Sequence, residues 1–472
     1  MQNSHYKMIL RCLFILLFIS FFHDSFAQNK FDIANVKQLG LITVDITTVN
    51  GEIPTCDYVS APEGSMGHTC TNQNKVPCKI DIYDNETLIY SSGEYVKGVS
   101  GATIKINGNT SSYSDNKPYK IKLQKKADLL VRGNDKFEDK NWRLIKDAVT
   151  LKTMIGLKIN ELISLPWTPA YKPCNVFLNG EYIGCYLLIE SVERNSNCRL
   201  DVNKSTGYIV ERDAYWWNEN KYFATNYFSS AKGYRWTWKY PDEDDVTIEQ
   251  EQYIQEYINT VEESINNGTY EQYIDVLSFA KWILAHDILG TWDSGGSNLY
   301  VMKYDNSENS LLQMANLWDF DTCFSMNKNE FSRYHDATYD YYYHHLFTNS
   351  NKSFLNTYKQ LWNEQKSVIL NDIISFITNY VNSDEAVALQ LSREYHSEKW
   401  NTSINNIYNE AEYYISWLTE HFNLIDSIIN TSTNMNEVRS CKGGEMYNLY
   451  GIKVKSPHKG LFISNSNKII VR

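Results

Sequence analysis

The chain has 472 residues, enough for two or three domains that each bury a hydrophobic core. Hydrophobic residues make up 43% and charged residues 21% of the chain, values typical of soluble globular proteins, which excludes a wholly disordered chain. The formal net charge of −11 argues against nucleic acid or an anionic lipid surface as the main partner.

The first 27 residues have the layout of a secretory signal peptide. Lys7 and Arg11 precede a short apolar run at residues 12–22, and Ser25-Phe26-Ala27 follows. The apolar run is too short to span a bilayer, and no later segment reaches the roughly 18 apolar residues that a membrane helix needs. We therefore expect cleavage near Ala27, a secreted or cell-surface protein, and no transmembrane segment.

The cysteines that follow the signal segment are even in number, which fits an oxidising compartment. Cys174 and Cys185 flank Asn179-Gly180, a two-residue turn that would place them opposite each other on paired strands. A disulfide and two buried free thiols are equally favoured there. Three further cysteines lack the close pairing of zinc ligands, which favours a disulfide among them over a metal site. These are Cys56, Cys70 and Cys78.

The first half of the chain is predicted to be rich in β-strands. Short alternating runs at residues 31–84 are broken by turns, and the pattern continues to residue 123. At residues 119–123 the alternation places Lys120 and Lys122 on one face of a strand and the apolar side chains on the other. A helix at residues 151–165, a hairpin at 175–189 and strands at 208–211 and 236–240 are expected to follow.

The second half is predicted to be helical, with helices at residues 246–265, 270–289 and within 350–430. A β-rich half followed by an α-rich half indicates an α+β fold with two lobes and a ligand cleft between them. After a polar linker the tail returns to short strands and predicts a separate β module. The expected organisation is a signal peptide (1–27), an N-terminal β segment (28–100), a main domain (101–432) and a linker with a C-terminal β module (433–472).

The most informative segment is a predicted hairpin in the second half. Two apolar runs are joined by a polar turn at residues 305–310. If Tyr304 pairs with Leu311, the residues just outside the hairpin, Asn298 and Asp319, meet at one edge of the sheet. The hairpin therefore predicts a site that gathers an amide and a carboxylate.

Asp293 lies within loop reach of this pair, and the three residues form the set that phosphoryl transfer requires. Mg²⁺ prefers carboxylate, amide and phosphate oxygens, while a further carboxylate accepts the proton of the attacking hydroxyl. The spacing from Asp293 to Asn298 is that of a protein-kinase catalytic loop, and Asp319-Phe320 echoes the metal-binding Asp-Phe-Gly. We predict Asp293 as the catalytic base, with Asn298 and Asp319 as ligands of Mg²⁺ or Mn²⁺.

Binding of ATP also requires cations and a turn that covers the phosphates. Lys122 is the preferred lysine and Lys120 the second candidate, although a solvated strand face is the alternative interpretation of both. The turn at residues 107–112, which contains Asn109, is the candidate cover. Neither a P-loop nor a G-x-G-x-x-G motif occurs.

Several segments from about residue 100 to 325 together resemble the spore-coat CotH kinase family, especially its long members found in Bacteroidetes. The segments are Gly108-Asn109-Thr110-Ser111, Lys117-Pro118-Tyr119-Lys120-Ile121-Lys122-Leu123, Asn179-Gly180-Glu181-Tyr182-Ile183-Gly184-Cys185-Tyr186, Glu211-Arg212-Asp213, the loop from Asp293 to Asn298, and Trp318-Asp319-Phe320-Asp321. The resemblance implies an atypical, protein-kinase-like fold that uses ATP and Mg²⁺ on serine-containing substrates. It places the catalytic and metal-binding aspartates at Asp293 and Asp319.

The chain departs from this family pattern at one position, because family members often carry arginine where it has Asn107. Its tail resembles the C-terminal sorting modules of the same phylum, which implies delivery to the cell surface.

The main hypothesis is an exported kinase that transfers the γ-phosphate of ATP to serine-type hydroxyls of an exported or surface protein. One alternative is a catalytically silent surface protein that binds or adheres through a kinase-like fold. Another is a carbohydrate-active enzyme, which only the aromatic content of 14% favours.

Overall fold

The computed structural model describes residues 30–65, 68–71, 74–226, 233–291, 297–325 and 341–435, and four short strands between residues 446 and 471. Two units are present, residues 1–421 and residues 422–472. The candidate residues outside the described ranges include Asp293.

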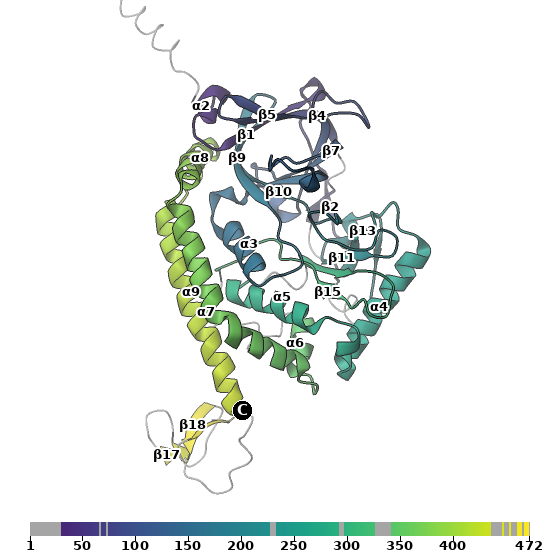
Figure 1. The fold of residues 1–472 in the computed structure, drawn as a ribbon, viewed down its shortest axis with the longest axis vertical. Helices are drawn as coiled ribbons and strands as arrows, with labels where there is room; N and C mark the ends of the chain where they lie inside the picture. The colour runs from purple at the N-terminus through teal and green to yellow at the C-terminus, as the bar shows by residue number, and fades with distance from the viewer. Residues whose placement is uncertain are drawn as a thin grey trace, which may run out of the picture. The chain divides into compact units, whose positions relative to one another are not determined.

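The strands of the first half close into a seven-stranded barrel, which carries one additional strand, β5, on its edge (Figure 1). The order around the barrel is β1-β9-β10-β8-β7-β6-β4, and β4 closes the ring by pairing with β1. The strands are β1 (Ile42–Thr48), β4 (Val76–Asp84), β5 (Thr87–Ser91), β6 (Ala102–Ile106), β7 (Tyr119–Ala127), β8 (Asp139–Ile145), β9 (Tyr171–Leu178) and β10 (Glu181–Glu190). A separate pair, β2 (Tyr58–Ser60) and β3 (His68–Cys70), precedes β4.

The prediction of a mixed fold with a β-rich first half is confirmed, but the expected kinase-like lobe layout is not what the strands form. Strand β1 pairs antiparallel with β4 and parallel with β9. It therefore joins β4 to β9, and without it the sheet would stay open between these two strands. Closure removes the free edges of the outer strands. Every second side chain of each strand then points into a common interior. The N-terminal β segment therefore contributes strands to the same barrel as the residues after position 101.

A second, open sheet holds the predicted hairpin. Its order is β12 (Tyr222–Phe223), β13 (Arg235–Tyr240), β11 (Tyr208–Asp213), β14 (Leu299–Lys303) and β15 (Gln313–Met314), all antiparallel. Val301 pairs with Met314 and Met302 with Gln313. This is the register that results from pairing Tyr304 with Leu311, so the predicted hairpin register is confirmed.

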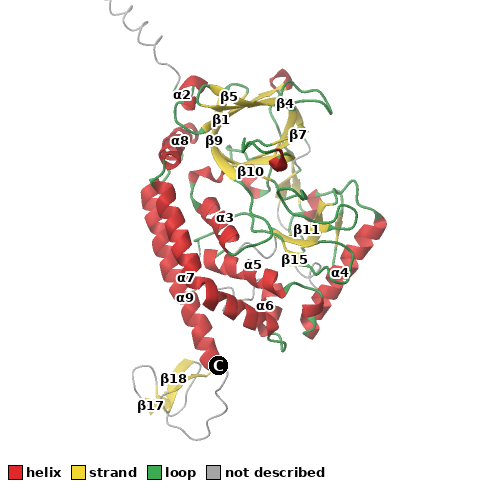
Figure 2. Cartoon of the chain, viewed as in Figure 1, coloured by secondary structure: helices red, strands yellow, loops and turns green. Residues whose placement is uncertain are grey.

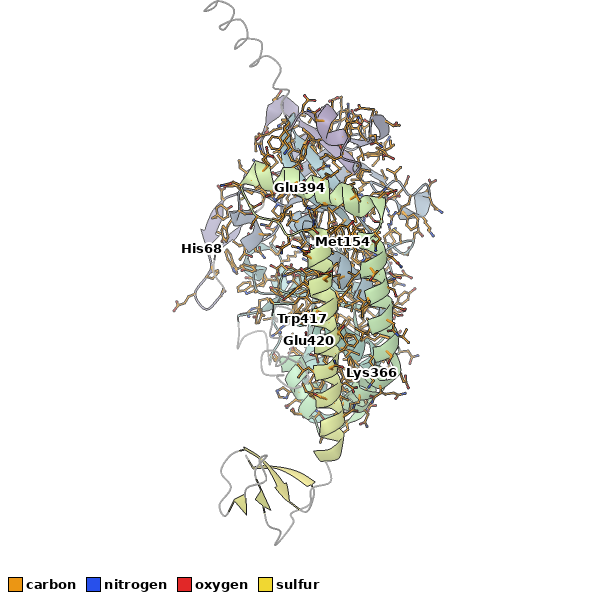
Figure 3. All side chains as sticks on the ribbon, turned by 90° about the vertical axis from the view of Figure 1, so that its left-hand side faces the viewer. His68, Met154, Lys366, Glu394, Trp417 and Glu420 are labelled. Carbon is orange, nitrogen blue, oxygen red and sulfur yellow. The ribbon has the colours of Figure 1, made fainter. Side chains whose placement is uncertain are left out.

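Most of the described helices of residues 1–421 lie away from the barrel, whereas α2 (Ile33–Lys37) and α8 (Asp384–Trp400) lie beside its strands (Figure 2). The other helices are α3 (Lys152–Leu162), α4 (Ile248–Asn267), α5 (Val276–Leu289), α6 (Tyr341–Thr348), α7 (Ser353–Val381) and the first part of α9 (Ile407–Met435); the short α2 precedes β1. In Figure 3, α8, marked by Glu394, crosses the direction of α7, marked by Lys366. No helix in the described part of the chain is long and apolar enough to cross a membrane.

The two helices that frame the second sheet have clear local start and stop signals. Thr247 and Gln250 form a reciprocal capping box at the start of α4, and Gly268 ends it in a left-handed conformation. Asp275 caps α5, whose side chains are almost all buried, and Gly290 ends that helix with φ 60°. The chain therefore leaves α5 in a fixed direction just before the segment that contains Asp293.

The expectation that Cys174 and Cys185 lie directly opposite each other is wrong, and of the two alternatives the structure has the buried free thiols. A β-bulge in β10 shifts the register by one residue, so Cys185 lies opposite Asn175 and Cys174 lies opposite Tyr186. Because the side-chain period of a strand is two, the shift sends the two thiols to opposite faces. Cys174 belongs to the barrel core, and the backbone N–H of Cys185 donates to His396 of α8. The cysteines of the described ranges are free thiols: Cys56, Cys70, Cys78, Cys174, Cys185, Cys198 and Cys323.

The second unit contains the strands expected for a C-terminal β module. They are β16 (Met446–Tyr447), β17 (Lys453–Val454), β18 (Gly460–Ser464) and β19 (Asn467–Val471). They pair antiparallel in the order β17-β16-β18-β19.

Candidate functional site

The hairpin brings Asn298 and Asp319 together, as its register predicts. The side-chain Nδ2 of Asn298 donates to Oδ2 of Asp319 at 3.4 Å. Both residues have a left-handed backbone, with φ 62° and 61°. Asn and Asp tolerate that conformation better than other residues with a side chain. The sharp changes of direction at the sheet edge therefore fall on short polar residues that can also bind a cation.

Asp319 is exposed, although both of its neighbours are buried. Trp318 and Phe320 retain 9% and 2% exposure. The Phe320 ring packs directly against Gly156 of α3, where any Cβ would overlap it. Because glycine lowers helix stability, this close packing gives a physical reason for its presence inside α3. The two aromatic anchors present the Asp319 carboxylate to solvent.

Helix α3 holds the same segment at two further positions, one turn before and one turn after Gly156. Lys152 Nζ donates to the carbonyl oxygen of Asp321 at 2.6 Å. Asn160 Oδ1 accepts from the backbone N–H of Leu317 at 2.7 Å. Residues four apart lie on one face of a helix, so α3 fixes the segment along its length.

Asp293 lies outside the described residues, but the structure fixes the chain on both sides of it. On the N-terminal side, Thr291 Oγ1 lies 2.8 Å from His286 Nδ1 at the end of α5. On the C-terminal side, Ser297 Oγ accepts from the backbone N–H of Ala214 at 3.3 Å. The role predicted for Asp293 remains a prediction.

Glu211 of β11 ties the hairpin edge to a buried lysine. One carboxylate oxygen accepts from the backbone N–H of Asn298 at 3.2 Å, and the other lies 2.8 Å from Lys239 Nζ. Burial acts to lower the pKa of Lys239, but the surrounding carboxylates, Glu211 foremost, raise it above its ordinary value. Lys239 is therefore a fixed positive charge that contacts Glu211, and Glu211 in turn accepts from the backbone of Asn298.

Asp213 ends the same strand next to the hairpin edge. Burial, followed by the negative charge of Glu211, raises the pKa of Asp213 to about 7, while Lys239 acts in the opposite direction. Its Oδ1 accepts from the backbone N–H of Tyr215 at 2.7 Å. This carboxyl group therefore changes its charge near neutral pH, close to Asn298.

The outer face of the barrel contributes a row of cations. Lys105, Lys120 and Arg143 lie directly opposite one another on β6, β7 and β8. Lys120 Nζ lies 3.9 Å from Glu193 Oε1, and burial lowers the pKa of Lys120 to about 8. The Arg143 guanidinium lies 5.3 Å from the centre of the Trp318 ring. The cationic row therefore ends at Trp318, the residue that precedes Asp319.

The structure separates the two lysines that the sequence offered for phosphate binding. Lys122 is exposed and lies opposite Thr103 and Asn141, whereas Lys120 stands within the cationic row. Of the two, the geometry favours Lys120. The surroundings of Lys122 fit the alternative of a solvated strand face.

The turn expected to cover the phosphates is held by its own contacts. The side-chain oxygen of Asn109 accepts from the hydroxyl of Thr69, and its backbone carbonyl accepts from the N–H of Ser112 at 3.1 Å. Asn107, at the start of the turn, accepts from Arg143 Nη1 at 3.2 Å. A guanidinium from β8 therefore lies beside the position where the family often carries arginine.

The donor set at the hairpin edge fits a hard divalent cation. Asn298 and Asp319 supply an amide oxygen and a carboxylate, and Mg²⁺ commonly takes only one or two carboxylates from the protein and fills its other positions with water and phosphate oxygens. Within the described residues, no group of three or more His, Cys, Asp or Glu side chains is placed to hold a metal. A cavity of about 510 Å³ between the end of β1, the start of α2 and the β9–β10 turn contains none of these site residues.

Sequence reasoning missed five charged residues of the site: Lys105, Arg143, Glu211, Asp213 and Lys239. Alternation within residues 102–106 places Lys105 on the outer face of its strand, so one signal for it was available. Strands β6, β7 and β8 are consecutive and antiparallel, but the register that places Lys105 and Arg143 on either side of Lys120 could not be read from the local pattern. Glu211 and Asp213 belong to a segment that carried the family resemblance, but the pattern alone indicated no role for them.

All of the site residues described above lie within one family match. The model of the CotH kinase protein family matches residues 104–422, more than half of the 472 residues. No curated protein matches the chain. With the match spanning barrel strands β6 to β10, the open sheet and the described helices up to α8, the chain belongs to the CotH kinase family.

Proposed function

We propose that this protein is a divalent-metal-dependent kinase that transfers the γ-phosphate of ATP to serine-type hydroxyls of an exported or surface protein. The supporting observation is the meeting of Asn298 and Asp319 at a sheet edge that also faces cations of the barrel. Membership of the family supports a kinase-like activity. Mg²⁺, the acceptor and the location outside the cytoplasm are parts of the proposal.

The reaction forms a bond between the acceptor oxygen and the γ-phosphorus and breaks the bond from that phosphorus to the oxygen of the leaving ADP. In the proposal, Asp293 orients the acceptor hydroxyl and takes its proton. Asn298 and Asp319 bind the divalent ion. The ion, when bound, neutralises charge on the phosphate oxygens. Glu211 keeps the Asn298 backbone in place through the contact already described.

Thermal unfolding of the chain without its first 27 residues tests the nucleotide and metal requirements. ATP with Mg²⁺ should raise the unfolding temperature, and EDTA should abolish the shift; at 100 times the Kd, a ligand stabilises the native state by about 2.7 kcal/mol. Asp319→Ala should lose this response, whereas its stability without ligand should fall by only about 1–2 kcal/mol, because the side chain is exposed but alanine is strained at the left-handed backbone of position 319. A full response in Asp319→Ala would contradict its assignment as a metal ligand.

Transfer of label from ATP labelled at the γ-phosphate tests the reaction and the base. Proteins of the source cells should become labelled, whereas ATP labelled at the α-phosphate should label none. Asp293→Ala should bind ATP as the wild type does and lose transfer. Equal transfer by wild type and Asp293→Ala would refute the role of Asp293, and stabilisation by a glycan but not by ATP would refute the kinase proposal.

A further inference from the structure

Three positive side chains stand directly opposite one another on the outer face of the barrel. Lys105 pairs with Lys120, and Lys120 pairs with Arg143, across β6, β7 and β8. Directly opposite residues on one face of an antiparallel sheet have neighbouring side chains, and like charges in such positions repel. An arrangement of this kind lowers stability unless negative charge lies close to it.

The described residues supply little of that negative charge. Glu193 lies 3.9 Å from Lys120, which is beyond hydrogen-bonding distance. Lys105 makes no hydrogen bond or ion pair with any residue in the described ranges. Burial lowers the pKa of Lys105, Glu219 acts to raise it, and Lys75 and Arg143 act to lower it further.

Arg143 provides a second, independent sign of a missing partner. Its Nε is buried and has no hydrogen-bond partner in the described part of the chain. Its Nη1 donates to the neutral Asn107 side chain. Buried polar groups are nearly always hydrogen-bonded, so an unpaired guanidinium nitrogen indicates a position for an acceptor. Guanidinium groups bind phosphate through paired N–H donors.

The position of the row relates it to the hairpin edge. Arg143 contacts the Trp318 ring, and Trp318 precedes Asp319. Adjacent strands are about 4.8 Å apart, so three strands place cations over about 10 Å, enough to contact more than one phosphate group. The row therefore ends at the residue that precedes the candidate metal ligand Asp319 and extends away from it.

We propose that Lys105, Lys120 and Arg143 form the surface that binds the phosphate chain of ATP, with Arg143 on the phosphate nearest Asp319. This inference rests on the proposed function and adds Arg143 and Lys105, which sequence reasoning did not identify. Lys122 serves as the matched control. It shares the strand and the face of Lys120, but it is exposed and lies opposite the neutral Thr103 and Asn141.

Equilibrium binding separates contacts to phosphate from contacts to the nucleoside. Wild type, Arg143→Gln, Lys105→Gln and Lys122→Gln would be titrated with ATP, inorganic tripolyphosphate and adenosine, each with and without Mg²⁺. Loss of a charged hydrogen bond should weaken binding of ATP and of tripolyphosphate by about tenfold or more in Arg143→Gln and Lys105→Gln. Adenosine binding should stay within about twofold of wild type in every variant, and Lys122→Gln should bind all three probes as the wild type does.

The unfolding midpoint without ligand provides a second readout. Since a neutral side chain removes repulsion within the row, Lys105→Gln should be at least as stable as the wild type. Arg143→Gln also loses the contacts with Asn107 and Trp318 and should be slightly less stable. A clear loss of stability in both would mean that the row is structural and would overturn the inference.

The outcomes distinguish this inference from the proposed function. If both row variants bind ATP and tripolyphosphate with wild-type affinity, the row does not bind phosphate, and the kinase proposal stays intact. Binding of tripolyphosphate that depends on the row, without phosphate transfer by the wild type, would support the row and count against the kinase proposal. Failure of the wild type to bind either polyphosphate would overturn both.

Discussion

The barrel and the open sheet of β12 to β15 use β-strands in different ways. The barrel closes through the pairing of β1 with β4, so its strands share an apolar interior that includes fully buried Trp142 and Leu144. The open sheet ends in turns, and its edge places Asn298 and Asp319 in left-handed conformations. A closed sheet is rigid, whereas the strand ends of the open sheet leave backbone and side chains that can contact a ligand.

The two regions contribute mainly opposite charges to the site, apart from Lys239, which β13 of the open sheet supplies. The barrel presents Lys105, Lys120 and Arg143 on its outside, and the open sheet presents Glu211 and Asp213 at the end of β11. The first set fits an anionic ligand and the second set a cation or an ammonium group. The difference between the two regions can therefore be tested with substitutions in each region, measuring stability and the response to ATP and Mg²⁺.

The largest expected effect comes from removing a core side chain of the barrel. Trp142 is fully buried, and its Nε1 donates to the carbonyl oxygen of Asp139 at 3.1 Å. Trp142→Ala should lower the free energy of unfolding by about 3–5 kcal/mol, since it leaves a cavity and an unpaired acceptor. Urea unfolding measures the change. A loss under about 1 kcal/mol would show that the barrel interior is not the main source of stability.

How much could be predicted differs between the two regions. The register of β14 and β15 follows from a polar turn of fixed length, so the meeting of Asn298 and Asp319 was predictable from local sequence. Closure of the barrel depends on parallel pairing of β1 with β9, strands that are far apart in the sequence. No local pattern specifies such a pairing. The row formed by Lys105, Lys120 and Arg143 lies on consecutive antiparallel strands, but its register depends on the exact bounds of β6, β7 and β8.

Two smaller features of the structure could not be predicted from the sequence for other reasons. The bulge in β10 adds one residue to a hairpin whose turn was identified correctly, and a single residue reverses the faces of Cys174 and Cys185. The packing of Phe320 on Gly156 joins two segments whose individual patterns contain no sign of the contact. Hydrophobic periodicity indicates which face is buried, but not which partner covers it.

The next effect concerns a contact between the barrel and α8. His396 Nδ1 accepts the backbone N–H of Cys185 at 3.1 Å, and burial, followed by the charge of Lys146, lowers the pKa of His396 to about 4. The unfolded chain takes up this proton below about pH 6.5 and the folded chain only below about pH 4, so stability falls as the pH falls between these values. The expected loss is about 3 kcal/mol, measured by urea unfolding at several pH values.

His396→Gln provides the control, because other groups also titrate in this range. The variant is expected to be less stable at pH 7 but to lose less stability than the wild type between pH 6.5 and pH 4. Parallel curves for the two proteins would mean that His396 takes up its proton equally in the folded and unfolded states.

A smaller effect is expected at the helix that supports the hairpin edge. Gly156→Ala adds a methyl group where the Phe320 ring packs, and the ring must move. Overpacking of this kind costs about 1–3 kcal/mol, although alanine favours the helix. Since Phe320 follows Asp319, the stabilisation by ATP and Mg²⁺ should also decrease. Glu161→Ala, at an exposed position of α3, is the control. It should change the free energy of unfolding by no more than about 0.5 kcal/mol and should leave the stabilisation by ATP and Mg²⁺ unchanged. Unchanged nucleotide response in Gly156→Ala would show that the Phe320 anchor does not position Asp319.

The smallest expected effect tests the register of the barrel itself. Cys174 faces the interior and Cys185 faces α8, so reductant should break no bond between them. A disulfide across such a short hairpin would stabilise the native state by about 3 kcal/mol, whereas two free thiols should leave the unfolding free energy within about 0.5 kcal/mol with and without reductant. Mass spectrometry of a digest alkylated in denaturant without reductant should find both residues alkylated. A linked peptide would place the thiols on one face, which is possible only without the bulge in β10, and the pairing of β10 with β9 would then need to be reassigned.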